Sequence, residues 1–369
     1  MKKIFYILLV LPIIGLSQTP DLQSDTLTLI KQSSFSKVTD YLQQYNRDSV
    51  PGIAISILYK GKVQYKEGFG MGDLEKNIPI NTNTIFDLAS IAKTFTGIGI
   101  AILEEEKRLS LSDNIRKYLP EFPILNETIT VAHLIHQCSG LPDWVTILDE
   151  KGITQDDEIN AVDIWDAIKN IQNLNFKPGD QYKYSNTNYF LLAKIIENVT
   201  DTTFHEWIQQ RIFNPLGMWD SYIASCNKTE LRDVARSYIE TEDGAYIYKP
   251  DLTIAPGSTS FFSSVDDMNK FLFELQRQEL FSKEIYKLIF EPMTLNDGSI
   301  GYYGYGIGLR SFRQYKYISH GGGWQGFRSE YWHFPDLQLS MIILSNCPAL
   351  DPFDLAVYIT KILLELTDP

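Results

Sequence analysis

The chain has 369 residues, of which 44% are hydrophobic and 21% are charged, an ordinary globular composition that argues against a disordered protein. Its formal net charge of −13 leaves no excess of basic residues to neutralise phosphates, so we expect no nucleic-acid partner. The length allows one large domain or two lobes around a sizeable core.

Residues 1–17 have the layout of a secretory signal peptide. Two lysines precede an apolar run over residues 4–14, and small residues follow at Gly15 and Ser17. The run is shorter than the roughly 20 residues that a membrane-spanning helix needs. The layout predicts cleavage after Ser17. We therefore expect a secreted or periplasmic protein with no stable membrane insertion after cleavage.

The segment that follows changes from polar to strongly patterned. Residues 18–36 predict a flexible segment, and residues 35–45 predict a first amphipathic helix. Two β-rich runs at 53–59 and 63–70 flank a turn that contains glycine, which predicts a hairpin. The stretch 90–106 is rich in Ala, Ile and Leu and predicts a helix.

Helical patterns dominate the middle of the chain, and strands return in the last third. Short strands are predicted at 315–319, 328–334 and 339–345, before a closing helix at 352–366. Strands at both ends of the chain predict an α+β fold, with one antiparallel sheet built from both termini and flanked by helices. A mostly helical lobe would be inserted between them.

The boundaries of this arrangement follow from where the patterns change. The α/β part would cover about 37–120 and 250–369, and the helical lobe about 121–249. Together they would form one domain over residues 37–369.

The cysteines and histidines predict no metal centre. Cys138, Cys226 and Cys347 are too few for a disulfide framework, and we expect buried thiols, with a single bridge left open. The five histidines lack the spacing of a zinc hydrolase, so we predict no metal.

Ser90 and Lys93 are the strongest candidates for a catalytic pair. Helical side chains three residues apart share a face, and the first turn of a helix favours a developing anion. Lys93 could accept the serine proton if burial lowered its pKa. Two other S-x-x-K pairs, at 34–37 and 225–228, lie in polar surroundings, whereas the residues around Ser90 are apolar or small.

Tyr184-Ser185-Asn186 is the only Y-x-N among 21 tyrosines. A tyrosine beside a lysine can move protons, and an asparagine amide can hold the lysine or a substrate carbonyl. The same residues also suit a turn with an asparagine cap before the next helix. Both interpretations can hold together.

His320-Gly321-Gly322-Gly323 allows two functional interpretations. An oxyanion hole of the lipase type would need a downstream G-x-S-x-G, which the chain lacks. The alternative places the stretch at the end of the strand over 315–319, where glycines let a substrate lie against the strand edge. A backbone N–H exposed there would contribute about 3 kcal/mol of transition-state stabilisation.

The three motifs occur in the order Ser90/Lys93, Tyr184/Asn186 and His320/Gly322. In this order they resemble the serine β-lactamase-like family of class C β-lactamases, DD-carboxypeptidases, esterases and D-aminopeptidases. The resemblance runs from about residue 37 to 367 and includes PGIAISILYKGKVQYKEGFG, TVAHLIHQCSGLPDW and GFRSEYWHFPDLQLSMIILSN. It implies a β-lactamase/transpeptidase-like fold and a structural role for His136.

The resemblance also implies acyl transfer without a metal or organic cofactor. Ser90 would attack a carbonyl while Lys93 and Tyr184 share the proton transfers, and Asn186 would orient Lys93 and the substrate. The N–H groups of Ser90 and Gly323 would form the oxyanion hole. Water would then hydrolyse the acyl-enzyme.

Two departures from the family pattern bear on substrate choice. His320 stands where β-lactamases usually have lysine, and its ordinary pKa near 6.5 would leave it partly charged at best. Thr259 and Ser260 replace two usual glycines, which we expect to narrow or rehydrate the cleft wall. The S-D-N match at residues 112–114 lies in a polar loop and predicts a helix N-cap.

The leading prediction is therefore a secreted serine hydrolase that cleaves an ester or amide bond in a small molecule or peptide, as an esterase, D-aminopeptidase or related peptidase. One alternative is a β-lactamase or DD-carboxypeptidase that acts on β-lactams or peptidoglycan stem peptides. Another is a non-catalytic binder of cell-wall peptides. The sequence leaves the acyl donor and the oligomeric state open.

Overall fold

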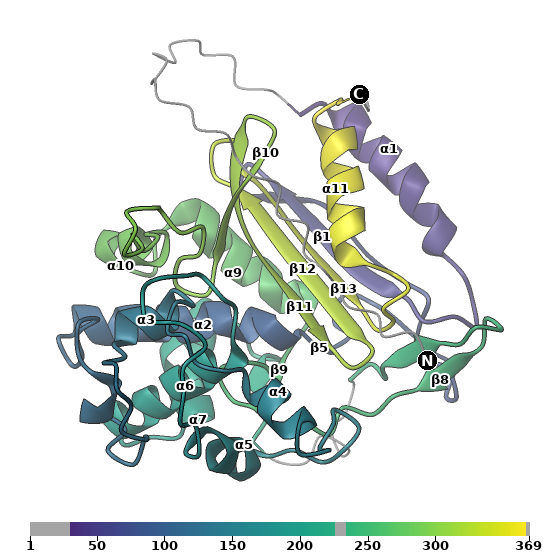
Figure 1. Cartoon of the computed structure of the whole chain (residues 1–369). Coiled ribbons are helices and arrows are strands. Elements are labelled where there is room, and N and C mark those ends of the chain that lie inside the picture. The colour runs from purple at the N-terminus through teal and green to yellow at the C-terminus, as the bar shows by residue number, and fades with distance from the viewer. Residues whose placement is uncertain (1–29, 226–233, 367–369) are drawn as a thin grey trace.

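A computed structural model describes residues 30–225 and 234–366 (Figure 1). The predicted signal peptide lies outside these residues. The first helix, α1, begins at Gln32, so the end of the segment 18–36 that we expected to be flexible is helical. Within the described part of the chain, no helix combines the length and the apolar character needed to cross a membrane.

One six-stranded antiparallel sheet forms the centre of the molecule. The N-terminal hairpin joins the C-terminal strands through pairing of Ile53 with Ser345 and of Tyr59 with Leu339, which confirms a sheet built from both ends of the chain. In spatial order the strands are β10 (Gly308–Phe312), β11 (Tyr315–Trp324), β12 (Phe327–Phe334), β13 (Leu339–Ser345), β1 (Ile53–Tyr59) and β2 (Lys62–Phe69).

Strand β1 is buried on both faces because the sheet separates two apolar layers. Its sequence, IAISILY, has the β-branched residues that suit such a strand. Ile53, Ile55 and Ile57 face a layer formed with α1 and α11, while Ala54 and Leu58 face the larger layer around α2. Figure 1 shows α1 and α11 lying together on one side of the sheet.

The helical part of the chain lies on the other side of the sheet (Figure 1). The helices that we expected in the middle of the chain are present between residues 131 and 216. The helices are α1 (Gln32–Leu42), α2 (Ala92–Glu105), α3 (Val131–Ile135), α4 (Trp144–Asp149), α5 (Ala161–Ile168), α6 (Asn186–Thr200), α7 (Phe204–Ile208), α8 (Asn214–Leu216), α9 (Val265–Arg277), α10 (Lys283–Ile289) and α11 (Pro352–Leu363).

Short elements connect the sheet to the helices. The small sheets pair β3 (Met71–Asp73) with β4 (Ile78–Pro79), β9 (Phe261–Ser263) with both β5 (Phe86–Asp87) and β6 (Tyr222–Ile223), and β7 (Tyr238–Glu240) with β8 (Tyr246–Tyr248). The 3-10 turns are η1 (Gln43–Tyr45), η2 (Ala89–Ile91) and η3 (Ile115–Lys117), and η4 (Gln209–Phe213) is a π-helical turn.

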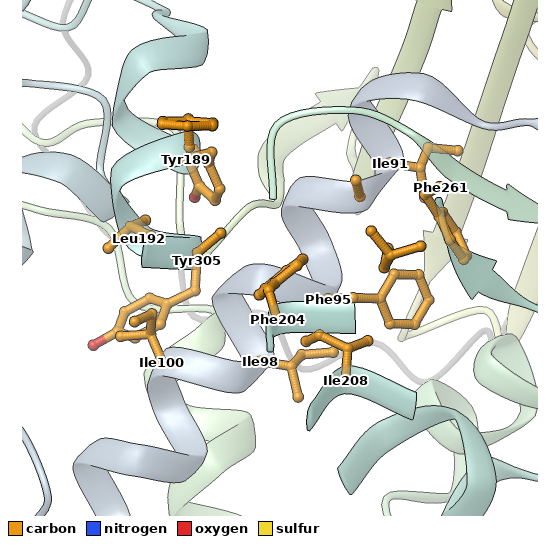
Figure 2. Packing of buried hydrophobic residues seen from close by; sticks show 14 of the residues in the cluster. Ile91, Phe95, Ile98, Ile100, Tyr189, Leu192, Phe204, Ile208, Phe261 and Tyr305 are labelled. Carbon is orange, nitrogen blue, oxygen red and sulfur yellow. The ribbon is translucent and has the colours of Figure 1, made fainter. Parts of the chain in front are cut away.

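Helix α2 runs through the middle of the larger core. Figure 2 shows its apolar side chains packed between α6, α7 and β9. The centroid of the Phe95 ring lies 4.8 Å from the centroid of the Phe261 ring and 5.2 Å from that of the Phe213 ring. Such dense aromatic packing leaves little freedom for the helix to shift. The residues at its N-terminal end therefore stand on a rigid support.

Candidate active site

Ser90 lies on the 3-10 turn η2, two residues before α2 begins. The carboxylate of Asp87 accepts a hydrogen bond of 2.8 Å from the N–H of Ala89, and Leu88 N–H donates to the Phe261 carbonyl at 2.7 Å. These bonds tie the turn to β9. Ser90 is half-buried, so its hydroxyl is fixed in place and still within reach of solvent.

Lys93 is fully buried, and its Nζ meets three oxygen atoms. Nζ lies 3.0 Å from Ser90 Oγ, 2.8 Å from Asn186 Oδ1 and 2.5 Å from the carbonyl oxygen of Ser258. The amide and carbonyl oxygens only accept hydrogen bonds. A neutral amine therefore spends both of its N–H groups on Asn186 and Ser258, which leaves its lone pair for the Ser90 hydroxyl.

The electrostatics of the site favour that neutral amine. Burial lowers the pKa of Lys93 from 10.5 to about 7, and the nearby charge of Asp143 opposes part of this shift. The buried ammonium is disfavoured because it loses its hydration. At neutral pH a large fraction of Lys93 is thus able to accept a proton.

Tyr184 lies over the same lysine. Nζ of Lys93 is 4.9 Å from the centre of its ring. Burial raises the pKa of Tyr184 far above its usual value near 10, and a hydrogen bond with Ser90 opposes only part of the shift. Its phenol therefore keeps its proton at neutral pH and can donate a hydrogen bond or a proton.

Asn186 is the first residue of α6, while Ser185 occupies the N-cap position without a side-chain cap hydrogen bond, so the alternative interpretation of an asparagine cap is wrong. A residue that sequence reasoning missed, Asp143, holds this asparagine in place. One oxygen of Asp143 accepts 3.0 Å hydrogen bonds from both the backbone N–H and Nδ2 of Asn186. The available signal was the position of Asp143, directly after SGLP and before α4.

His320 lies within β11 and is 8% exposed. Its Nδ1 is 2.7 Å from the carbonyl oxygen of Gly321, and its Nε2 is 2.9 Å from the hydroxyl of Tyr303. A carbonyl only accepts, so Nδ1 carries the proton. Nε2 then accepts from the Tyr303 hydroxyl, and both ring nitrogens of the neutral imidazole are used within the protein.

The expectation that His320 carries at most a partial charge agrees with a neutral imidazole at neutral pH. Burial lowers the pKa of His320 from 6.5 to about 3, and the nearby Lys93 adds to the shift. Tyr303, which supplies the second hydrogen bond, was not predicted from the sequence. The site thus lacks, at this position, the cation that a lysine would provide.

The glycine stretch lies inside β11 rather than after it, since pairing with β12 continues as far as Trp324. A Cβ on Gly322 would lie 2.1 Å from the carbonyl oxygen of Leu88, so only glycine lets the strand approach the turn that carries Ser90. Pairing of β10 with β11 stops at Ser319. Gly323 is exposed, and its role as an oxyanion donor stays a prediction.

Glu330 explains the glycine at position 321. It pairs with Gly321 across the sheet, and a Cβ on Gly321 would lie 2.3 Å from its Oε2. Oε1 of Glu330 accepts a 2.7 Å hydrogen bond from Trp332 Nε1. Burial raises the pKa of this carboxyl to about 8. The carboxyl group of Glu330 thus occupies the space that a side chain at position 321 would need.

The segment with Thr259 and Ser260 differs from our expectation. Both side chains are buried, so neither rehydrates a cleft wall. Ser260 has a left-handed backbone, with φ of 65°, where glycine would be favoured. Its hydroxyl donates to the Thr253 carbonyl and accepts from Ala255 N–H within the same loop. The segment contributes its backbone, the Ser258 carbonyl, to the site.

Several other predictions concern residues away from Ser90. Asn114 caps η3 by accepting a 2.9 Å bond from Arg116 N–H, as predicted for the S-D-N match. His136 is buried against the Tyr303 carbonyl, with Nδ1 3.1 Å away, in a structural position. Cys138 and Cys347 are buried free thiols. Cys226 lies outside the described residues.

Comparison with known proteins agrees with this architecture. The profile of the family named Beta-lactamase matches residues 38–363. Penicillin-binding protein 4* of Bacillus subtilis is 31% identical over 303 residues, which are 78% of this chain and 66% of that protein. Protein flp of Staphylococcus aureus is 28% identical over 87% of this chain and 64% of that protein. The chain therefore belongs to the beta-lactamase family of serine hydrolases.

A solved structure shows the same fold. The octameric penicillin-binding protein homologue from Pyrococcus abyssi superposes with a TM-score of 0.77 at 29% identity, over 90% of this chain and 77% of that one. This confirms the predicted β-lactamase/transpeptidase-like fold. The chain spans slightly less than two thirds of the length of the Bacillus and Staphylococcus proteins.

Proposed function

We propose that the protein hydrolyses an ester or amide bond through an acyl-enzyme on Ser90. The observation that carries this proposal is the 3.0 Å contact between Ser90 Oγ and the buried Nζ of Lys93. A serine hydroxyl is a weak nucleophile until a nearby base accepts its proton. With a pKa of about 7, Lys93 is matched to that task at neutral pH.

The proton path follows from the charge states of the site. Neutral Lys93 takes the proton as Ser90 Oγ bonds to the substrate carbonyl carbon. The oxyanion that forms would be held by the N–H groups of Ser90 and Gly323. Collapse breaks the bond to the leaving group, which takes a proton from Lys93 directly or through Tyr184. Attack of water on the acyl group, with Lys93 again as base, restores the serine.

The substrate class follows from His320. Because its imidazole is neutral and both nitrogens are engaged, it offers no charge to a substrate carboxylate. We therefore propose acyl donors that carry no carboxylate next to the scissile bond, such as simple esters and D-aminoacyl amides. His320 and Gly322 would form the substrate wall along β11.

A second candidate is a DD-carboxypeptidase or β-lactamase activity. It is favoured by the similarity to penicillin-binding protein 4*. In that case the substrate carboxylate would be bound without help from His320. The third candidate, a cell-wall peptide binder without catalysis, conflicts with the intact Ser90–Lys93 contact.

The experiment compares the purified protein with its Ser90→Ala variant. A fluorophosphonate probe should label only the wild type, and p-nitrophenyl esters or D-alanine p-nitroanilide should be hydrolysed only by the wild type. Equal labelling and turnover by the two proteins would refute the proposal. Nitrocefin hydrolysis or a stable penicillin adduct on Ser90 would instead select the second candidate.

A reciprocal variant tests the substrate class. His320→Lys should raise turnover of nitrocefin relative to the neutral ester by about tenfold, because a cation beside a carboxylate adds a charge-assisted hydrogen bond. His320→Gln, which stays neutral, is the control. An unchanged ratio in the lysine variant would show that this position does not select substrate charge.

We further propose that the protein is exported. The proposal rests on the signal-peptide layout of residues 1–17 and on the names of the penicillin-binding relatives. Expression of the full chain in a bacterial host, followed by N-terminal sequencing of the secreted or periplasmic fraction, should give a protein that begins at Gln18. An uncleaved chain confined to the cytoplasm would contradict it.

A further inference from the structure

The carboxylate of Asp143 connects two parts of the site that are far apart in sequence. Its Oδ1 accepts a 3.0 Å hydrogen bond from Val145 N–H and so caps α4. Its Oδ2 accepts from the backbone N–H and from Nδ2 of Asn186, both at 3.0 Å. Three N–H donors thus point at the two oxygens, an environment that suits the ionised carboxylate.

This arrangement decides which way the Asn186 amide faces. The two ends of an asparagine amide have nearly the same shape, so a flip exchanges its donor and its acceptor. A carboxylate only accepts, so the NH₂ group must face Asp143 and Oδ1 must face Lys93. A flipped amide would place donors against Nζ, and the lysine would lose an acceptor that keeps its lone pair directed at Ser90.

Asp143 also acts on Lys93 through charge. Besides Asp143, the titratable groups near Nζ are the phenols of Tyr184 and Tyr189 and the imidazole of His320. Burial keeps both phenols and the imidazole neutral. The charge of Asp143 raises the pKa of Lys93 against the effect of burial, and Lys93 in turn lowers that of Asp143, which burial raises.

We propose that Asp143 is a positioning residue for acyl transfer. It fixes the Asn186 amide with its oxygen toward Lys93, and it supplies a negative charge next to Asn186 and Lys93. The inference rests on the proposed function, because it assigns Asp143 a part in activating Ser90. The same carboxylate joins the start of α4 to the start of α6. Its loss would therefore alter the base without touching the nucleophile.

The test is Asp143→Asn in the full-length protein, with Asp351→Asn as the matched control. Asp351 caps α11 in the same way, by accepting from Phe353 N–H at 2.8 Å, on the opposite side of the sheet. With a p-nitrophenyl ester, we expect kcat/KM of Asp143→Asn to fall by about tenfold, since a misplaced group next to the chemistry is costly. The control should keep the wild-type value.

The pH profile separates positioning from a loss of folding. Loss of the charge should lower the pKa of Lys93, so the acidic limb of kcat/KM should move down by about one pH unit. Reduced stability alone would lower the rate at every pH and leave the limb in place. That result, or a limb that moves equally in the control, would overturn the inference.

An independent measurement keeps the two proposals distinguishable. Lysine labelled with ¹³C at Cε, with the Lys93 signal assigned through Lys93→Met, reports the pKa of Lys93 by NMR without any turnover. If the wild type hydrolyses nothing but Asp143→Asn still lowers this pKa, the proposed function fails, while the effect of Asp143 on the charge of Lys93 stands. An unchanged pKa in the variant refutes the role of Asp143 alone.

Discussion

The hydroxyl of Tyr303 lies 2.9 Å from Nε2 of His320 and donates to it, so a neutral histidine is built into the strand beside the nucleophile. A hydrogen bond to the neutral form disfavours protonation. We predict that Tyr303→Phe raises the pKa of His320, although burial still holds it below 6.5. Histidine ¹H–¹⁵N NMR titration, with the signal assigned by His320→Gln, measures this, and a fall in the pKa would contradict the tautomer that we assign.

The pKa of Lys93 predicts the pH dependence of the wild-type enzyme. The group must be neutral to accept the serine proton, so kcat/KM should rise with pH and level off above about 7. Lys93→Ala should lower kcat/KM by at least about 100-fold at pH 7 because the general base is lost. Ester hydrolysis followed from pH 5 to 9 tests both statements. A rate that is highest at pH 5 would exclude Lys93 as the base.

The missing side chain at Gly322 lets β11 approach the turn that carries Ser90, and we predict that this close approach is needed for activity. In Gly322→Ala, the added methyl would lie 2.1 Å from the Leu88 carbonyl, so η2 or the strand must move. We expect at least about a 100-fold loss in kcat/KM, because a displacement near 1 Å is enough for that. Gly72→Ala is the control, since its new Cβ meets its neighbours at 3.6 Å or more. Equal kinetics for the two variants would show that the close approach is dispensable.

Glu330 predicts a pH-dependent stability. Its carboxyl has a pKa of about 8 in the folded protein and an ordinary value near 4.3 when unfolded. Between these pH values the unfolded chain binds fewer protons, so Glu330 makes the free energy of unfolding fall as pH rises.

In Glu330→Gln the side chain does not titrate, so this fall in the free energy of unfolding is absent. The glutamine oxygen still offers an acceptor for Trp332 Nε1. Relative to the wild type, the variant should therefore gain more than about 1 kcal/mol between pH 5 and pH 8. Urea unfolding of both proteins at the two pH values measures the difference. A constant difference would show that Glu330 titrates normally in the folded state.

The main architecture was predictable because its signals are local. The S-x-x-K spacing places Ser90 and Lys93 on one helical face, and the β-rich runs at both ends of the chain predict the shared sheet. Two motifs that are separately weak lie in contact in the structure, through Lys93 and Asn186. Each motif and each strand is recognised from residues within a few positions of one another.

The missed features depend on tertiary contacts. The position of Asp143 after SGLP predicts at most a helix cap, because its second partner, Asn186, is more than forty positions away. The charge of His320 could not be predicted, since burial and Tyr303 decide it. Glycine has a low propensity for strands, so the sequence did not predict that β11 continues to Trp324. This continuation depends on pairing with β12.

The pairing of β1 with β13 has a consequence for how the protein matures. Ile53 can pair with Ser345 only after Ser345 has been synthesised. Formation of the central sheet therefore closes one of the longest loops that the chain can form. Until then Ser90 and Lys93 have no strand β11 beside them and no finished core beneath them. Neither half of the gene product can carry the chemistry alone, and any truncation before β13 should yield an inert, aggregation-prone chain rather than a weaker enzyme.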